Sequence, residues 1–225
     1  MNKVLFVAPH PDDETLSCAG TILRHRRDGD EIHWLIMTTI SESAGYTAER
    51  VISREKEIAK VSKTYSFDEV HRMKYIATTL DTIPRATLID EISKIIHRIK
   101  PQIIYLPYRG DIHSDHQVVF DTVASCTKSF RYPSIRRVRV YETLSETEFG
   151  IRTDDMGFRP NLWIDISDFI DQKVEIMRLY KNEINEHPFP RSERNIRSLA
   201  TYRGATVGCE AAEAYMQVKD IVKDE

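Results

Sequence analysis

Short apolar runs alternate along this chain with stretches whose apolar residues recur at helical spacing, and no other feature limits the fold as strongly. The runs that suit buried strands are residues 4–8, 32–39, 70–75 and 103–106. The stretches with helical spacing are residues 13–28, 47–64 and 84–100. Because parallel strands must be joined by crossovers, usually helices, this order predicts an α/β fold with a Rossmann-like, mostly parallel sheet and helices on both faces.

The second half of the chain predicts further elements. A helix should begin near His116, strands are expected at residues 138–143 and 162–166, and helices at residues 170–180 and 192–203. Residues 145–160 form a long polar segment of the kind that acts as a lid or a substrate loop. No Gly/Ser/Pro-rich linker divides the sequence, so we expect residues 1–225 to form a single domain.

The composition argues against several classes of partner. With 32 basic and 35 acidic residues the net charge is −3, which gives no broad positive field for nucleic acid. The first apolar run is too short for a signal peptide, and no run approaches the roughly 18 apolar residues of a membrane span. Three scattered cysteines suggest neither a disulfide framework nor a metal knuckle, so we expect a cytoplasmic protein. A homo-oligomer is compatible with the sequence.

Two motifs with metal-binding side chains follow two of the predicted strands. The sequence HPDDE occupies residues 10–14, directly after the first run, and HSDH occupies residues 113–116, after the fourth. In the doubly wound strand order 3-2-1-4, the first and fourth strands are neighbours at the topological switch point, where such sheets bind ligands. The two motifs are therefore predicted to meet in one crevice.

The residue types in these motifs suit a catalytic metal. His10, Asp13 and His116 provide two imidazoles and a carboxylate, a ligand set that leaves open positions on Zn²⁺ for water and substrate. Zinc lowers the pKa of its bound water to roughly 7. The neighbouring Asp12 would then act as the general base. Fe²⁺ or Co²⁺ would fit the same ligands, and non-haem iron oxygenases use a similar set.

Structural explanations compete with this interpretation. Pro11 and the following acids also complement the exposed N–H groups at a helix start, and loop histidines are often only solvated. Arg109, close to the second motif, is a candidate for binding an anionic substrate group, although a loop arginine more often pairs locally. Glu142, after a predicted strand, is a candidate acceptor for the second nitrogen of a metal-bound histidine.

The two motifs resemble those of the PIG-L/LmbE-type zinc-dependent N-deacetylases, and the likeness extends over nearly the whole chain. Features of the bacterial carbohydrate-acting branch recur at Arg54 with Glu57, Tyr141-Glu142, Pro188-Phe189-Pro190-Arg191-Ser192, Arg203-Gly204, Gly208 and Ala212-Glu213-Ala214. Ser114 departs from the family pattern, in which proline is common at this position. This departure removes no ligand.

The resemblance implies a role for each matching residue. Zinc would bind His10, Asp13 and His116, with Asp12 as the general base. His113 would polarise the carbonyl or protonate the leaving group, and we expect it to be protonated when it stabilises the oxyanion. In the substrate site, Arg54 would contact the sugar and Asp81 would hold a sugar hydroxyl.

The expected function is therefore a metal-dependent hydrolase. It would remove the acetyl group from a small-molecule N-acetylated amino-sugar conjugate of the GlcNAc type, using zinc-bound water and an aspartate base. The same site would also suit another N-acyl substrate, such as a glycoside precursor of a thiol or an antibiotic intermediate. A metal-stabilised sugar-binding protein without turnover is the alternative from outside the enzymes.

Overall fold

A computed structural model describes residues 1–151 and 157–222 of the chain. The strands are β1 (Lys3–Ala8), β2 (Glu31–Thr39), β3 (Glu69–Ile76), β4 (Ile103–Pro107), β5 (Arg137–Tyr141), β6 (Leu162–Asp165) and β7 (Ala212–Asp220). The α-helices are α1 (Asp13–Arg27), α2 (Ala48–Tyr65), α3 (Arg85–Ile99), α4 (Ser114–Ser125), α5 (Ile170–Met177) and α6 (Glu193–Val207). Within the described ranges, no helix combines the length and apolarity that crossing a membrane requires.

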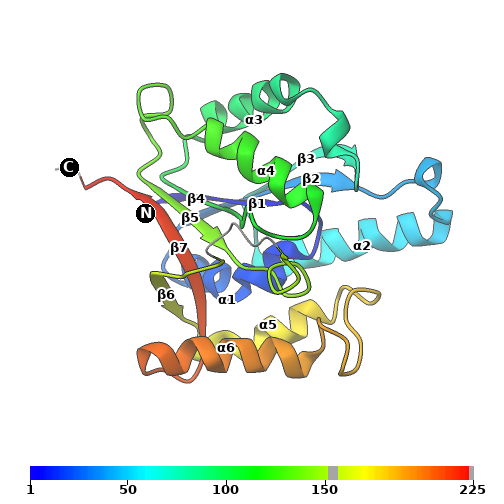
Figure 1. The fold of residues 1–225 in the computed structure, drawn as a ribbon, viewed down its shortest axis with the longest axis vertical. Coiled ribbons are helices and arrows are strands. Elements are labelled where there is room, and N and C mark those ends of the chain that lie inside the picture. The colour runs from blue at the N-terminus through cyan, green and yellow to red at the C-terminus, as the bar shows by residue number, and fades with distance from the viewer. Residues whose placement is uncertain (152–156, 223–225) are drawn as a thin grey trace.

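The strands form one sheet in the order β3-β2-β1-β4-β5-β7-β6. The first five strands of this order run parallel, and β7 and β6 pair antiparallel at the far edge. Figure 1 shows α3 and α4 on one side of the sheet and α1, α5 and α6 on the other. The predicted α/β class, with a mostly parallel sheet and helices on both faces, is confirmed.

Burial on both faces explains why β1 is a continuous apolar run. Val4, Phe6 and Ala8 pack into a core that includes α1 and α2, whereas Leu5 and Val7 pack into a second core that includes α3 and α4. All five are at most 1% exposed. Strands covered on both sides read as unbroken apolar sequence rather than as an alternation. Burying each of these larger side chains contributes about 1.5–3 kcal/mol.

One strand was not predicted. The sequence gives no strand signal over β7, because its first half is Ala-Glu-Ala-Tyr and its second half is mostly polar. The strand forms because β5 and β6 supply hydrogen-bonding partners on both of its edges, and because its buried Glu213 is neutralised by contacts from other elements. Tertiary pairing therefore overrides the weak local preference.

Candidate metal centre and active site

The sheet topology brings the two sequence motifs together. Strands β1 and β4 are parallel neighbours, with Val4 opposite Ile103 and Phe6 opposite Tyr105, so both chains leave the sheet at the same edge. The HPDDE motif forms the turn from β1 into α1, and the HSDH motif forms the start of α4. The predicted strand order 3-2-1-4 is confirmed, and the crevice lies at its switch point.

The three residues predicted as metal ligands converge at this crevice. Asp13 Oδ2 lies 3.3 Å from His10 Nδ1 and 3.3 Å from His116 Nε2. One ligand atom from each of the three residues can be chosen so that all lie within 4.8 Å of one another. Separations of this size are compatible with all three groups coordinating a single cation.

The environment of His116 fits a metal ligand. Its side chain is completely buried, and its Nε2 makes no hydrogen bond with any residue in the described ranges, although Asp13 lies nearby. A buried nitrogen that lies close to a carboxylate without making a hydrogen bond is uncommon, so it calls for a specific explanation. A coordinated ion provides that explanation, because an imidazole nitrogen directed at a metal needs no hydrogen bond. The donor set, two imidazoles and a carboxylate, fits zinc, iron(II) or cobalt(II).

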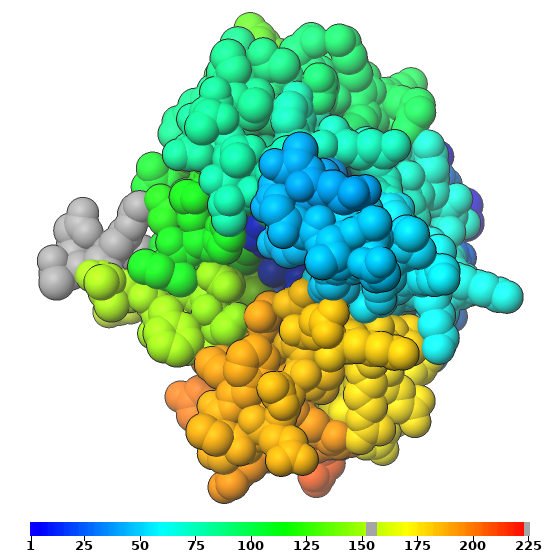
Figure 2. All heavy atoms as spheres, turned by 90° about the vertical axis from the view of Figure 1, so that its right-hand side faces the viewer, coloured from blue at the N-terminus to red at the C-terminus, as the bar shows by residue number. Residues whose placement is uncertain are grey.

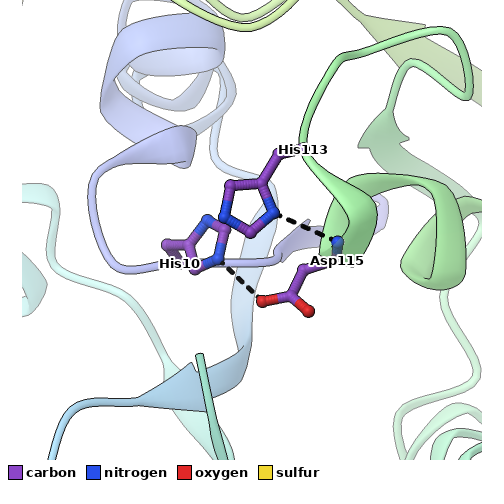
Figure 3. Close-up of side chains that lie close together, drawn as sticks. All are labelled: His10, His113 and Asp115. Atoms are coloured by element: carbon purple, nitrogen blue, oxygen red, sulfur yellow. Dashed lines mark hydrogen bonds and ion pairs between the residues drawn. The ribbon is translucent and has the colours of Figure 1, made fainter. Parts of the chain in front are cut away.

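Two further carboxylates hold the histidines in place. Asp111 Oδ2 lies 2.7 Å from His116 Nδ1, and Asp115 Oδ2 lies 3.0 Å from His10 Nε2. Figure 3 shows the Asp115 carboxylate directed at the His10 ring. Each carboxylate binds the nitrogen that points away from Asp13, which fixes the ring orientation and leaves the other nitrogen for a metal.

Sequence reasoning assigned this supporting role to the wrong acid. Glu142 makes a two-point pair with Arg203, at 2.7 and 2.5 Å, instead of contacting a histidine. The residues that do so are Asp115, within the second motif, and Asp111, two residues before it. Their place in this motif and directly before it was the available signal. Asp111 is further held by Thr147 Oγ1 at 2.5 Å.

The close packing of these charges shifts their pKa values strongly. Burial alone would lower the pKa of His10, but its hydrogen bonds to Asp115 and Asp13 raise it to about 9. Burial likewise opposes the charged form of His116, yet Asp13 and Asp111 raise its pKa well above the usual value. Burial would raise the pKa of Asp13, but the two histidines lower it well below its usual range. The site therefore strongly favours positive charge beside Asp13.

Asp12 lies beside the ligands but points to a different set of partners. Its carboxylate is buried, and Arg191 Nη1 is 3.5 Å away. Burial, the Asp13 charge and Glu183 raise the pKa of Asp12 well above its usual value, against the opposing effect of Arg54 and Arg191. A buried carboxyl group with a raised pKa, next to a metal site, has the properties of a proton-transfer group.

His113 caps the first turn of α4. Its Nδ1 accepts the backbone N–H of Asp115 at 3.1 Å, as Figure 3 shows, so the ring hydrogen of the neutral imidazole lies on Nε2. The His113 ring lies 4.4 Å from the His10 ring. Burial, together with His10 and His116, lowers the pKa of His113 to about 4. We expected a protonated His113, but these surroundings favour the neutral form.

His10, Asp12, Asp13 and His113 line a cavity of about 240 Å³. Figure 2 shows the N-terminal residues, in dark blue, at the bottom of a hollow between light-blue, green and orange segments. Sequence reasoning did not identify much of its wall, which includes Thr38, Thr39, Ile40, Tyr46, Ser145, Glu146, Glu183 and Arg191. For Arg191 the available sequence signal was the family-like segment at residues 188–192.

The three predicted substrate residues differ in position. Arg54 is buried, lines the cavity, and contacts Pro11 O at 2.6 Å and the Glu183 carboxylate. Asp81 is exposed in a short 3₁₀ turn, and the exposed Arg109 pairs with Asp121, Nε to Oδ1, at 2.7 Å. Neither Asp81 nor Arg109 is among the described residues that line the cavity.

A comparison with protein families identifies the chain. The sequence model described as "PIG-L: GlcNAc-PI de-N-acetylase" matches residues 5–127, a range that contains both motifs and more than half of the chain. The protein belongs to the PIG-L family. The expected resemblance is therefore confirmed, and the residues that converge at the crevice are those of the two PIG-L motifs.

Curated PIG-L relatives match over most of the chain. Diacetylchitobiose deacetylase of Thermococcus kodakarensis is 25% identical and the match covers 98% of this chain and 85% of the relative. A probable N-acetyl-alpha-D-glucosaminyl L-malate deacetylase 2 of Bacillus anthracis is 23% identical, with 80% of each chain covered. Both relatives are named as deacetylases of N-acetylated sugars.

Solved structures share the PIG-L fold at low identity. N,N'-diacetylchitobiose deacetylase from Pyrococcus horikoshii superposes with a TM-score of 0.76 at 21% identity, over 97% of this chain and 84% of the other. GalB, the 4-carboxy-2-hydroxymuconate hydratase of Pseudomonas putida, superposes with a TM-score of 0.74 at 15% identity, over 100% and 99%. Because a deacetylase and a hydratase share this architecture, these likenesses show the fold and do not select the reaction.

Proposed function

We propose that this protein is a metal-dependent N-deacetylase. It hydrolyses the acetamide of an N-acetylated amino-sugar conjugate of the GlcNAc type, and it releases acetate and a free amine. The observation that carries this proposal is the convergence of His10, Asp13 and His116 next to Asp12, a carboxylate that lines the cavity and does not belong to this group of three. The names of the sugar-deacetylating relatives support the substrate class.

The metal would be held by His10 Nδ1, Asp13 and His116 Nε2. When bound there, a divalent ion would acidify a water molecule and polarise the acetamide carbonyl. We propose zinc as the resident ion. A fold neighbour is described as the zinc-inhibited form of teicoplanin deacetylase, so iron(II) and cobalt(II) should be tested beside zinc.

Asp12 would transfer the protons. It occupies the cavity wall next to a ligand without belonging to the group of three, so its carboxylate remains available to take a proton from the attacking water. The protonated Asp12 would then deliver this proton to the amide nitrogen as the C–N bond breaks. A single residue thus serves as base and then as acid.

His113 would stabilise the negative oxygen of the tetrahedral intermediate. Its Nδ1 accepts the backbone N–H of Asp115, so the hydrogen of the neutral ring is on Nε2. This Nε2–H would be the donor to the oxygen. Loss of such a donor typically reduces turnover by about 10²–10³. A neutral imidazole does not readily give up its remaining proton, and we therefore assign protonation of the leaving amine to Asp12 rather than to His113.

The cavity suits one sugar ring better than an extended chain. Its volume of about 240 Å³ is below the ~300–1,000 Å³ that is usual for ligand pockets. Polar groups such as Thr39, Tyr46 and Arg54 line its wall and could bind hydroxyl groups. The remainder of a conjugate would extend into solvent.

Rival functions predict different outcomes in the same assay. Another N-acyl substrate would release a different carboxylic acid, a hydratase would release none, and a sugar-binding module would bind without turnover. The availability of Asp12 argues against the binding module, because a structural metal site normally uses four protein ligands and needs no base.

The central test measures acetate from a panel of N-acetylated sugar conjugates, with the enzyme loaded with zinc, iron(II) or cobalt(II). Asp12→Asn should retain the metal and lose acetate release by at least about 10²-fold, because the base is removed. Asp28→Asn, a surface change at the far end of α1, is the matched control and should behave as wild type. Unchanged release in Asp12→Asn, or no acetate with any metal, would contradict the proposal.

A further inference from the structure

The peptide bond between Pro11 and Asp12 is held at both of its polar ends. The Pro11 carbonyl oxygen accepts a hydrogen bond from Arg54 Nη1 at 2.6 Å. The Asp12 N–H donates to Glu14 Oε2 at 3.0 Å. These two contacts together fix the orientation of the peptide plane that leads into the proposed base.

The backbone at Asp12 is in a conformation that requires such support. Its φ is 140° and its ψ is −27°, in a region that residues with a side chain rarely adopt. Strained backbone of this kind persists only where the surrounding structure holds it, and it concentrates at functional sites. Asp12 is also the residue before the first turn of α1, so a change in its φ would redirect its side chain.

Glu14 is itself rigidly positioned. Its side chain is 1% exposed, and its Oε1 accepts hydrogen bonds from Thr15 Oγ1 at 2.6 Å and from Tyr180 Oη at 2.8 Å. Its other oxygen is therefore the one that faces the Asp12 N–H. Burial raises the pKa of Glu14 to about 7 despite these donors, and none of the three proposed metal ligands is among its hydrogen-bond partners.

Arg54 is held in the same way on the other end of the peptide. It is buried, it pairs with Glu183, and its Nε lies 3.5 Å from Glu57 Oε2. Its guanidinium also lies over the Tyr180 ring, 5.5 Å from the centroid. Tyr180 therefore contacts both Glu14 and Arg54, the two side chains that hydrogen-bond this peptide.

Building on the proposed function, we propose that Glu14 and Arg54 are positioning residues that clamp the Pro11–Asp12 peptide and so direct the Asp12 carboxylate into the cavity. The acidic residue that ends the HPDDE motif then acts through the base, without touching metal or substrate. Arg54 gains a role in addition to any contact with the sugar.

Two substitutions of Glu14 separate this role from a general effect on folding. Glu14→Met keeps the approximate volume but removes the acceptor, and it should lower kcat about 10–100-fold, because small misplacements of reacting groups are this costly. The KM and the metal content should remain close to wild type. Glu14→Gln restores an amide oxygen that can accept the Asp12 N–H, and it should recover most of the rate.

The dependence on Asp12 provides a sharper criterion. In an Asp12→Asn background, Glu14→Met should cause no further loss, because the base through which it acts is already absent. Tyr65→Phe removes a buried hydroxyl that contacts Thr15 and serves as the control, with activity like wild type. An additive loss, a fall in metal content, or no rescue by Glu14→Gln would overturn the clamp.

A crystal structure of Glu14→Met tests the clamp independently of catalysis. The φ of Asp12 should leave the region near 140°; an unchanged φ overturns the proposal. If the backbone changes but wild type releases no acetate, the clamp is supported and the proposed function fails. Should Glu14→Met not fold, Glu14→Met/Tyr180→Phe removes the phenol left without its acceptor and allows the same measurement.

Discussion

Asp12 carries an unfavourable backbone conformation as well as a buried carboxylate, and the two effects can be separated by stability measurements. A residue with a side chain at this φ costs about 1–3 kcal/mol, whereas glycine adopts it readily. Asp12→Gly should therefore be more stable than Asp12→Ala by about 1 kcal/mol or more in urea unfolding.

A matched pair at another helix start provides the reference. Thr47 precedes α2 with an ordinary φ of −70°, so Thr47→Gly and Thr47→Ala report the usual difference between glycine and alanine at this position. The strain at Asp12 predicts a larger difference than at Thr47. Equal differences at the two positions would mean that the Asp12 backbone stores no strain.

The histidines make metal uptake depend on pH. The pKa of His10 is raised to about 9, mainly by hydrogen bonds to Asp115 and Asp13 that outweigh burial, so below pH 9 a proton must leave before a metal binds. The pKa of His116 is raised as well. Metal affinity of the metal-free protein should therefore rise at least about tenfold per pH unit from pH 7 towards 9, and the rise should flatten above pH 9, where His10 has lost its proton.

Competition with a chelator at a series of pH values measures this dependence. Asp115→Asn removes a negative charge that favours protonated His10, which should lower the pKa of His10. The metal affinity of this variant should therefore level off at a lower pH than that of wild type. Asp121→Asn, which removes a surface partner of Arg109, should leave the wild-type profile unchanged. An affinity that does not vary between pH 7 and 9 would show that these protons do not compete with the metal.

At the scale of secondary-structure elements, one buried carboxylate joins three of them. Glu213 of β7 pairs with Lys173 of α5 at 2.7 Å and accepts the backbone N–H groups of Gly20 and Thr21 in α1 at 3.0 and 2.8 Å. Lys173 and Glu213 are both 4% exposed. This network closes the helical layer over the antiparallel edge of the sheet.

Breaking this pair from one side should be costly. Lys173→Met leaves the Glu213 charge buried without its cation, which should lower the free energy of unfolding by about 3–5 kcal/mol. Lys173→Met/Glu213→Gln should recover part of this loss, since the buried charge is removed and the amide oxygen still accepts one of the two α1 N–H groups. Arg178→Met, which removes an exposed partner of Glu193, should cost at most about 1 kcal/mol. Equal losses in the buried and exposed variants would contradict this account.

The elements that could be predicted from sequence are those whose signal is local. The predicted helix over residues 13–28 corresponds to α1, which ends before Gly29 at a φ of +80°, the left-handed conformation expected of a helix-terminating glycine. Strands β1, β2 and β4 were recognisable because burial on both faces requires continuous apolar runs. Strand β7 was not, because its identity depends on partners far away in the sequence.

At the scale of the whole molecule, the site is assembled from segments that are distant along the chain. The β1–α1 turn and the start of α4 supply the proposed metal ligands, and the segment between α5 and α6 supplies Glu183 and Arg191 to the cavity wall. The first two segments carry motifs whose chemistry is readable from residue type, whereas residues 188–192 of the third were noticed only through their resemblance to the family. The third contributes through its position in the tertiary structure, which sequence spacing does not reveal.

The sequence by itself determined the α/β class, the strand order around the switch point, and the residues His10, Asp12, Asp13, His113 and His116 that meet there. These follow from local apolar patterns and from short motifs attached to strand ends. The tertiary structure alone decided which carboxylates orient the histidines, which nitrogen of each ring faces Asp13, and how the Asp12 backbone is held. Such features depend on hydrogen bonds a few ångströms long between separate elements, and these directions become fixed only when the chain is packed.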